Sequence, residues 1–170
     1  FASSPNEKSF CGESAEKYTQ RLFSTVDEIR AKLKESGIEA KDIEDFANVV
    51  MAGKLIEAAG EAKTTNAKGK EIVDVKTQSE LLLKALELAS KADTVMGLQT
   101  KVQVLGQLAQ LSLGMKDPEK ARYYATQQEN AINDLQRKSD FTANIEQSRL
   151  SNKQINLQIT LAEKPTTKEK

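Results

Sequence analysis

Apolar residues at helical spacing continue almost without interruption from Glu71 to Ala162. The one firm stop is the segment 114–118, Gly-Met-Lys-Asp-Pro. Glycine suits the end of a helix, and Asp followed by Pro suits the start of the next one. At 1.5 Å per residue, each arm would be roughly 65 Å long, far beyond an average helix. The pattern therefore predicts two long antiparallel helices, over about 71–113 and 118–163.

The N-terminal part of the chain predicts two shorter helices. The first covers about 14–35, with an inward face of Ala15, Tyr18, Leu22, Val26, Ile29 and Leu33. Ser36-Gly37 ends it, because glycine adopts the left-handed conformation after a helix at little cost. A second helix starts near Asp42, weakens at Gly60 and leads into a polar loop over 64–70. Its inward face is expected to contain Ile43, Phe46, Ala47, Val50, Leu55 or Met51, and Ala58 or Ala59.

Two packing arrangements compete for these helices. In one, the N-terminal helices cover only the open end of the long hairpin; in the other, they run end to end beside it. The second is favoured because the far half of the 71–113 helix has a wide apolar stripe, which needs more than one neighbour. Leaving five or six large side chains exposed would cost about 1.5 to 3 kcal/mol each. The stripe there contains Val95, Leu98, Val102, Val104, Leu105, Leu108 and Leu111.

The predicted fold class is therefore all-α. We expect an elongated antiparallel bundle of long helices, a three-helix rod whose first helix is broken near Gly37. One domain is expected over 1–163, with an irregular segment at 1–13 and a polar tail at 164–170.

Several residues inside the long helices break the apolar pattern. Gly97 and Gly106 lower helix propensity, and a close approach of another helix backbone is one use for them. Gln128, Ser148 and Asn152 fall within the apolar stripe of the last helix. Two interpretations stay open for these polar residues: they set the register of packing, as buried polar residues do in coiled coils, or they mark the wet side of the helix.

The composition of the chain argues against a catalytic or metal-binding function. The chain has 25 basic and 25 acidic residues, so its formal net charge is zero and a nucleic-acid partner is not expected. Histidine is absent, which removes the commonest general base and metal ligand, and one cysteine cannot form an internal disulfide. No phosphate-binding glycine loop or glycosylation sequon occurs. The sequence predicts a protein that is not an enzyme, with no catalytic, cofactor-binding or metal residues and no cofactor.

Each remaining candidate has an ordinary interpretation. Cys11 has no partner to activate it, so a plain thiol is favoured. Tyr123-Tyr124 could form a binding platform, but spacing places Tyr124 inward. The pairs Asp27-Glu28 and Glu44-Asp45 are expected on solvated faces, because a diiron bundle also needs Glu-x-x-His motifs. The segment 68–70, Lys-Gly-Lys, is a small basic loop.

The two long helices around 114–118, the break at Ser36-Gly37 and the tail 164–170 resemble trypanosome surface-coat helical-bundle proteins of the glutamic acid/alanine-rich type. The resemblance implies a cell-surface or extracellular structural protein, a coiled-coil parasite coat molecule that passes through secretion to the cell membrane. It implies a GPI anchor attached beyond Lys170. The role would be to shield the membrane or to present a distal tip to a host or vector protein or glycan. No catalytic residues carry over.

A different class of function also fits the sequence. A soluble helical adaptor would bind a partner helix or ligand along an apolar groove of the 71–113 helix, if the N-terminal helices leave that groove open. A homo-oligomer is a further partnership that composition leaves open.

Overall fold

The computed structural model describes residues 15–139 and 142–164, with side chains from Asn144 onward in the second stretch. Within these ranges the chain forms six helices and one pair of short strands, so the all-α prediction is confirmed. The contacts divide the chain into two compact units, 1–92 and 93–170. They are called unit 1 and unit 2 below, and each is described by itself.

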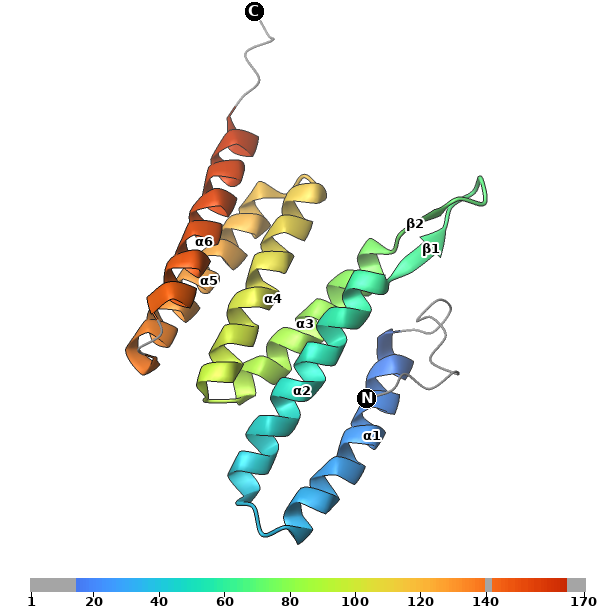
Figure 1. Ribbon diagram of the computed structural model, residues 1–170. Helices are drawn as coiled ribbons and strands as arrows, with labels where there is room; N and C mark the ends of the chain where they lie inside the picture. Colours follow the sequence, from blue (N-terminus) through green and yellow to red (C-terminus); the bar gives the residue numbers. More distant parts are fainter. Residues whose placement is uncertain (1–14, 140–141, 165–170) are drawn as a thin grey trace, which may run out of the picture. The chain divides into compact units, whose positions relative to one another are not determined.

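Unit 1 is a group of three helices with a hairpin inserted before the last one (Figure 1). The central helix α2 packs against both α1 and α3, and the two strands pair antiparallel with Thr64 opposite Ile72. The elements are α1 (Ala15–Glu35), α2 (Ala40–Glu61), β1 (Lys63–Thr65), β2 (Glu71–Val73) and α3 (Val75–Lys91).

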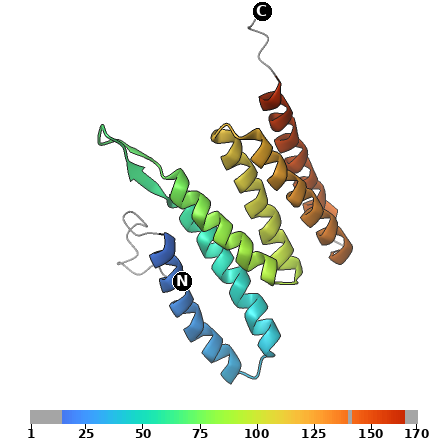
Figure 2. The ribbon, with the colours of Figure 1, turned by 180° about the vertical axis from the view of Figure 1, so that it is seen from behind.

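Unit 2 is a second group of three helices, seen from behind in Figure 2. It contains α4 (Val95–Gly114), α5 (Pro118–Lys138) and α6 (Thr142–Glu163). Helix α4 packs closely along α5, α6 packs on α5, and α4 and α6 also touch each other. Because α4 and α6 both pack on α5, α5 is the central helix of unit 2.

The expected helix over 71–113 is two helices, which is a correction. Ala92 has extended backbone angles, φ −92° and ψ 104°, and ends α3. Thr94 then caps α4, because its side-chain oxygen accepts a hydrogen bond from the Gly97 backbone nitrogen at 3.0 Å. A Thr cap satisfies a backbone donor that has no partner inside the new helix. The apolar pattern crosses this break without losing its phase, so periodicity alone did not reveal it.

The expected helix over 118–163 is also divided. Ser139 takes an extended conformation, φ −133° and ψ 135°, and its backbone nitrogen closes the last turn of α5 on the Leu135 carbonyl at 2.9 Å. The next helix begins at Thr142 and returns along α5. Six helices of moderate length therefore replace the predicted three-helix rod.

The physical requirement behind the rod is met in another way. The apolar half of the predicted third helix is α4, whose Val102, Val104, Leu105 and Leu108 are buried. Within unit 2, α5 and α6 pack against this helix, and no long N-terminal partner is needed for that contact. Because α6 folds back on α5, a wide stripe gains two neighbours within one unit. The burial of these four residues is confirmed, and α5 and α6 are the helices that contact α4 within unit 2.

The polar loop expected at 64–70 is the tip of a hairpin. The Asn66 side-chain oxygen accepts hydrogen bonds from the backbone nitrogens of Lys68 and Lys70, both at 3.0 Å. Gly69 has φ +75°, which is the left-handed region that glycine tolerates. The flanking residues Lys63–Thr65 and Glu71–Val73 are exposed on both strands, so their alternation carries no burial signal.

The two predicted helix stops are confirmed, with one shift at the second. Gly37 has φ +78° after the end of α1. At 114–118, the left-handed residue is Lys116, φ 60°, rather than Gly114, which still belongs to α4. Asp117 caps α5 by accepting a hydrogen bond from the Lys120 nitrogen at 3.0 Å.

The predicted inward faces are partly confirmed. Val26 and Ala15 of α1 are buried, while the other four predicted residues of that face are only half-buried. Phe46, expected inside, is 49% exposed. The segments 1–13 and 165–170, with Cys11, lie outside the described residues. The single-domain assignment over 1–163 stays a prediction.

Candidate functional site

The two tyrosines of α5 separate as the spacing predicts. Tyr124 is buried and Tyr123 is 61% exposed, with their ring centroids 5.4 Å apart in an edge-to-face arrangement. Burial, and to a smaller extent the neighbouring Tyr123, raise the pKa of Tyr124. Tyr124 is therefore part of the core of unit 2 rather than a binding platform.

The acidic pairs lie on surfaces, as expected. Arg30 of α1 bridges Asp27 on its own helix, at 2.6 Å, and Glu44 on α2, at 3.0 Å. Glu28 is exposed and Asp45 is half-buried. Among the described residues, no group of three or more Asp, Glu, Cys or His side chains is placed to hold a metal ion. In the same residues, no helix has both the length and the apolar content needed to cross a membrane.

The interior of unit 2 contains a network of side-chain amides. Gln128 of α5 is only 3% exposed, and its Nε2 donates to the Val102 carbonyl of α4 at 2.9 Å. Asn152 of α6 donates through Nδ2 to the Ala125 carbonyl at 2.9 Å and to the Gln128 Oε1 at 3.0 Å. Asn156 donates in turn to the Asn152 Oδ1 at 2.9 Å. The network therefore joins all three helices of unit 2.

Gly106 makes room for this network. A Cβ atom at position 106 would lie 2.7 Å from the Gln128 Nε2, closer than nonbonded atoms approach. The expected use of this glycine, the approach of another helix backbone, is therefore corrected: the approaching group is a buried side chain. Because Gly106 leaves the room in which Gln128 approaches the α4 backbone, it helps to fix where α5 meets α4.

Polar residues interrupt the apolar stripe of the predicted 118–163 helix at Gln128, Ser148 and Asn152, and two of these three set the register in which the helices of unit 2 pack. Gln128 and Asn152 are buried and hydrogen-bonded across helices, as the first interpretation required. Ser148 is half-buried and lines an open groove, as the second required. Both interpretations hold, each for different residues.

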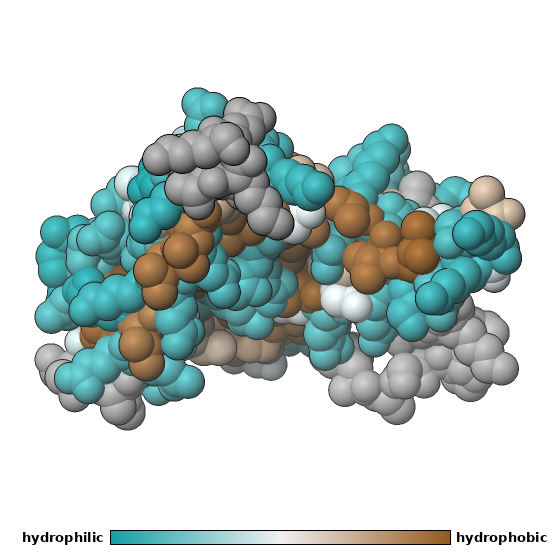
Figure 3. All heavy atoms as spheres, turned by 90° about the horizontal axis from the view of Figure 1, so that it is seen from above, coloured by the Kyte–Doolittle hydropathy of each residue, from teal (hydrophilic) through white to brown (hydrophobic). Residues whose placement is uncertain are grey.

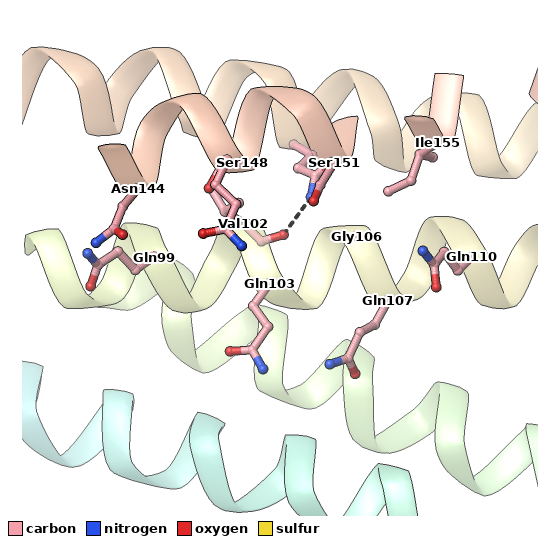
Figure 4. A pocket seen from close by; sticks show the side chains of 12 residues that line it. Gln99, Val102, Gln103, Gly106, Gln107, Gln110, Asn144, Ser148, Ser151 and Ile155 are labelled. Carbon is pink, nitrogen blue, oxygen red and sulfur yellow. Dashed lines mark hydrogen bonds between the residues drawn. The ribbon is translucent and has the colours of Figure 1, made fainter. Parts of the chain in front are cut away.

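The groove lies between α4 and α6 and has a volume of about 510 Å³. Figure 4 shows its side chains, with the hydrogen bond between Gln128 and Val102 dashed at its floor. Gln99 and Asn144 face each other near one end, and Ser148 and Ser151 point from α6 toward α4. Its lining is Gln99, Val102, Gln103, Gly106, Gln107, Gln110, Gln128, Asn144, Gln147, Ser148, Ser151 and Ile155.

The groove carries no charged side chain, although 29% of the chain is Asp, Glu, Lys or Arg. Helix α4 has one charged residue in 20, Lys101. The amides of the rim differ from those of the floor. Within the described part of the chain, the side chains of Gln99, Gln103, Gln107, Gln110 and Gln147 make no hydrogen bond to the protein. Their donors and acceptors are therefore available to a ligand.

The floor of the groove combines apolar and satisfied polar atoms. Val102 and Ile155 are buried, and Gln128 has its oxygen and nitrogen engaged by Asn152 and Val102. A ligand would therefore meet buried apolar groups and an amide already engaged in hydrogen bonds, bordered by further hydrogen-bonding side chains of α4 and α6. Such a surface can bind by hydrogen bonds and burial, but it offers neither an ionised group nor a nucleophile stronger than a serine hydroxyl.

The apolar groove expected along 71–113 stays a prediction. Leu83 of α3 and Met96 of α4 are exposed, but the space beside α4 is lined mainly by amides. Elsewhere in the described residues, large exposed apolar side chains include Ile72 and Val73 of β2, and Leu150, Leu157 and Leu161 of α6. Figure 3 shows apolar surface, in brown, in separate patches among hydrophilic surface.

The row of glutamines on α4 is visible in the sequence, although the predicted sites do not include it. Gln99, Gln103, Gln107 and Gln110 follow one another at intervals of four, four and three residues, which places them on one face of a helix. Ten of the twelve glutamines of the chain lie in 93–170. The facing row on α6 required the end of α5 at Ser139, which the sequence did not reveal.

Comparison of this chain with known protein families, with characterised proteins and with solved structures finds no match.

Proposed function

We propose that this chain is a non-enzymatic helical adaptor that holds a partner chain in the groove between α4 and α6. One observation carries the proposal: amides of α4 without protein partners and polar side chains of α6 line the same uncharged groove. Surfaces that bind other proteins are depleted in charge at their centre, whereas ordinary surfaces are rich in Lys and Glu. The exposed face of α4 fits the first description.

The fixed interior of unit 2 supports the same proposal. A binding surface loses less entropy on association when its backbone is already held in place. The contacts from Gln128 and Asn152 hold α4, α5 and α6 at fixed positions along one another. The groove is therefore a preformed feature of packed helices rather than of loops.

The coat hypothesis stays a prediction. The resemblance rested on two long helices around 114–118, the break at Ser36-Gly37 and the tail 164–170, and the described chain has six helices of 17 to 22 residues. Surface location, membrane anchoring beyond Lys170, secretion and a host or vector ligand are equally predictions. The adaptor proposal does not depend on any of them.

Site-directed photo-cross-linking in the native cells tests the adaptor proposal. A benzophenone side chain at position 103 or 107 lies at the rim of the groove, within reach of anything bound there. We expect a discrete adduct from both positions. The adduct should also form in lysates adjusted to roughly 0.5 M NaCl, because an uncharged interface has no ion pairs for salt to screen.

Gln158 provides the matched control. It is an exposed glutamine on α6 that does not line the groove. The same probe at position 158 should give no such adduct. Equal adducts from positions 107 and 158, or no adduct from any of the three, would remove the proposal.

A further inference from the structure

We infer that the occupant of the α4–α6 groove is an uncharged peptide segment in extended conformation, about five residues long and recognised mainly through its backbone. This inference rests on the proposed function and specifies the partner. The observations that carry it are the hydrogen-bonding inventory of the rim, the length of the glutamine row and the absence of charge.

The rim offers groups that complement a peptide backbone. Each glutamine side chain supplies two N–H donors and one carbonyl acceptor. An extended segment outside a sheet presents one N–H and one C=O per residue, and these need partners once they leave water. A bound helix satisfies its own backbone and would leave the rim amides of Gln103 and Gln107 without partners. The inventory therefore favours an extended segment over a helix.

The length of the row sets the length of the segment. Gln99 and Gln110 are eleven residues apart on α4, which corresponds to about 16 Å along the helix axis. An extended chain covers this distance with about five residues at 3.3 Å each. Asn144 and Ser151 border the groove from α6, so both sides of such a segment would meet polar groups.

Charge and shape restrict the side chains of the segment. A charged residue placed over Val102 and Ile155 would lose water without meeting an opposite charge, because no charged group lines the groove. Small polar or apolar side chains avoid this cost. The lining also lacks an aromatic ring, so a sugar would find no flat apolar face on which to stack.

NMR titration of the full chain tests the inference directly. The probe is a blocked pentapeptide, acetyl-Ser-Ala-Gln-Ala-Ser-amide, which has no charge. We expect saturable shifts of the side-chain amide signals of Gln103 and Gln107 and of backbone signals along α4 and α6. The dissociation constant should change by less than about twofold between low salt and roughly 0.5 M NaCl.

Three further ligands separate the alternatives. The same peptide with alternate backbone nitrogens methylated should bind at least about tenfold more weakly, because it loses backbone donors. A version with Lys and Glu in place of the two serines should also bind more weakly. Maltopentaose should cause no shifts in the groove.

Substitutions in the rim complete the test. Gln107→Leu keeps the size of the side chain and removes its hydrogen bonds, so we expect about a fivefold or larger loss of peptide affinity. Gln158→Leu, on α6 outside the groove, should leave affinity unchanged. Amide spectra that otherwise match those of the parent protein will show that both variants are folded.

The outcomes distinguish this inference from the function on which it rests. Equal binding of the methylated peptide, binding of maltopentaose, or no peptide shifts at all would overturn the inference. If cross-linking at positions 103 and 107 still gave its adduct, the adaptor proposal would stand with a different kind of partner. Loss of the adduct as well would remove both.

Discussion

The two units solve the same packing problem with different surfaces. Each has a helix that contacts two others of its unit and contributes many buried apolar residues: α2 in unit 1 and α4 in unit 2. The rest of the surface of α2 carries charged side chains, whereas the rest of the surface of α4 carries side-chain amides. The charged residues of α2 are Lys41, Asp42, Glu44, Asp45, Lys54, Glu57 and Glu61, against Lys101 alone in α4.

The same contrast appears in how neighbouring helices are joined. In unit 1, Arg30 joins α1 to Glu44 of α2 at the surface, where water weakens an ion pair. In unit 2, Gln128 and Asn152 join helices in the interior, where a hydrogen bond left unmade is costly. Helix α2 of unit 1 thus presents charged residues to water, while unit 2 combines hydrogen-bonded amides in its interior with an uncharged groove. The difference locates the proposed function on unit 2.

The largest test asks whether the two units are separate cooperative structures. Leu55→Ala in α2 and Ile132→Ala in α5 each remove a fully buried side chain. Each should lower the free energy of unfolding by about 2 to 5 kcal/mol through lost burial and the cavity left behind. Hydrogen exchange followed by mass spectrometry in urea measures the effect segment by segment.

If the units unfold independently, Leu55→Ala will accelerate exchange only in α1 to α3, and Ile132→Ala only in α4 to α6. Equal acceleration throughout the chain from either variant would show one cooperative domain. That result would support the single domain over 1–163 and would weaken the contrast between the units.

The next effect concerns the buried amides. Gln128→Ala leaves the Val102 carbonyl and one donor of Asn152 without this partner and opens a cavity beside Gly106. We expect a loss of about 2 to 3 kcal/mol in urea unfolding followed by circular dichroism. Gln158→Ala, at an exposed position of α6, should change stability by less than about 0.5 kcal/mol. Similar values for the two variants would mean that the network does not hold the helices together.

A pair of glycines, one in each unit, gives a smaller and opposite pair of effects. Gly53 lies in α2 with open space where a Cβ would stand, so Gly53→Ala should stabilise by roughly 0.5 to 1 kcal/mol. At Gly106 the same propensity gain meets a clash with the Gln128 Nε2 at 2.7 Å. Gly106→Ala should therefore be less stable than Gly53→Ala by about 1 to 2 kcal/mol.

The clash can be tested by removing its other partner. In the double variant Gly106→Ala with Gln128→Ala, the methyl group enters space that the glutamine has left. The two substitutions should cost less together than the sum of their separate costs. Strict additivity would show that Gly106 is present for some other reason.

The sequence predicted much of the fold because local rules agreed there. The stop at Gly37 and the cap at Asp117 each follow from one residue type at one position, and the burial of Tyr124 follows from helical spacing. The two missed breaks lay where an apolar pattern stayed in phase across a cap. Thr94 is an ordinary N-cap residue, but nothing in periodicity distinguishes a Thr that caps a helix from one inside it. Ser139 ends α5 without the glycine that usually marks a helix end.

The candidate site was less predictable for a related reason. The glutamine row of α4 is local and could be found from spacing alone. The facing row of Asn144, Ser148 and Ser151 becomes a second wall only when α6 turns back, and that depends on the break after Ser139. The hairpin at 63–73 was missed because all six strand residues are exposed, so no alternation marked them.

The smallest expected effect compares the N-caps of α3 and α4. Asp74 caps α3 by accepting hydrogen bonds from the Thr77 hydroxyl at 2.7 Å and the Thr77 nitrogen at 3.1 Å. These two bonds, the hydroxyl first, lower the pKa of Asp74. Because the folded pKa is lowered, the carboxylate stabilises the fold above the ordinary Asp pKa of about 4 and loses this contribution as pH falls further. Thr94, which caps α4, does not titrate in this range.

Asp74→Asn separates the charge from the cap. Asn is as good a cap as Asp, so stability near neutral pH should stay within about 0.5 kcal/mol of the parent, whereas Asp74→Ala should cost about 1 kcal/mol. Urea unfolding at neutral pH and below the ordinary Asp pKa gives the comparison. On acidification the parent should lose slightly more stability than Asp74→Asn, and the extra loss should be small because Asp74 is only half-buried, so water screens its charge. Thr94→Ala should cost a similar amount at both pH values, since its cap carries no charge. An equal pH dependence in the parent and in Asp74→Asn would show that the hydrogen bonds from Thr77 do not distinguish the charged from the neutral carboxyl, and the two caps would then be physically alike.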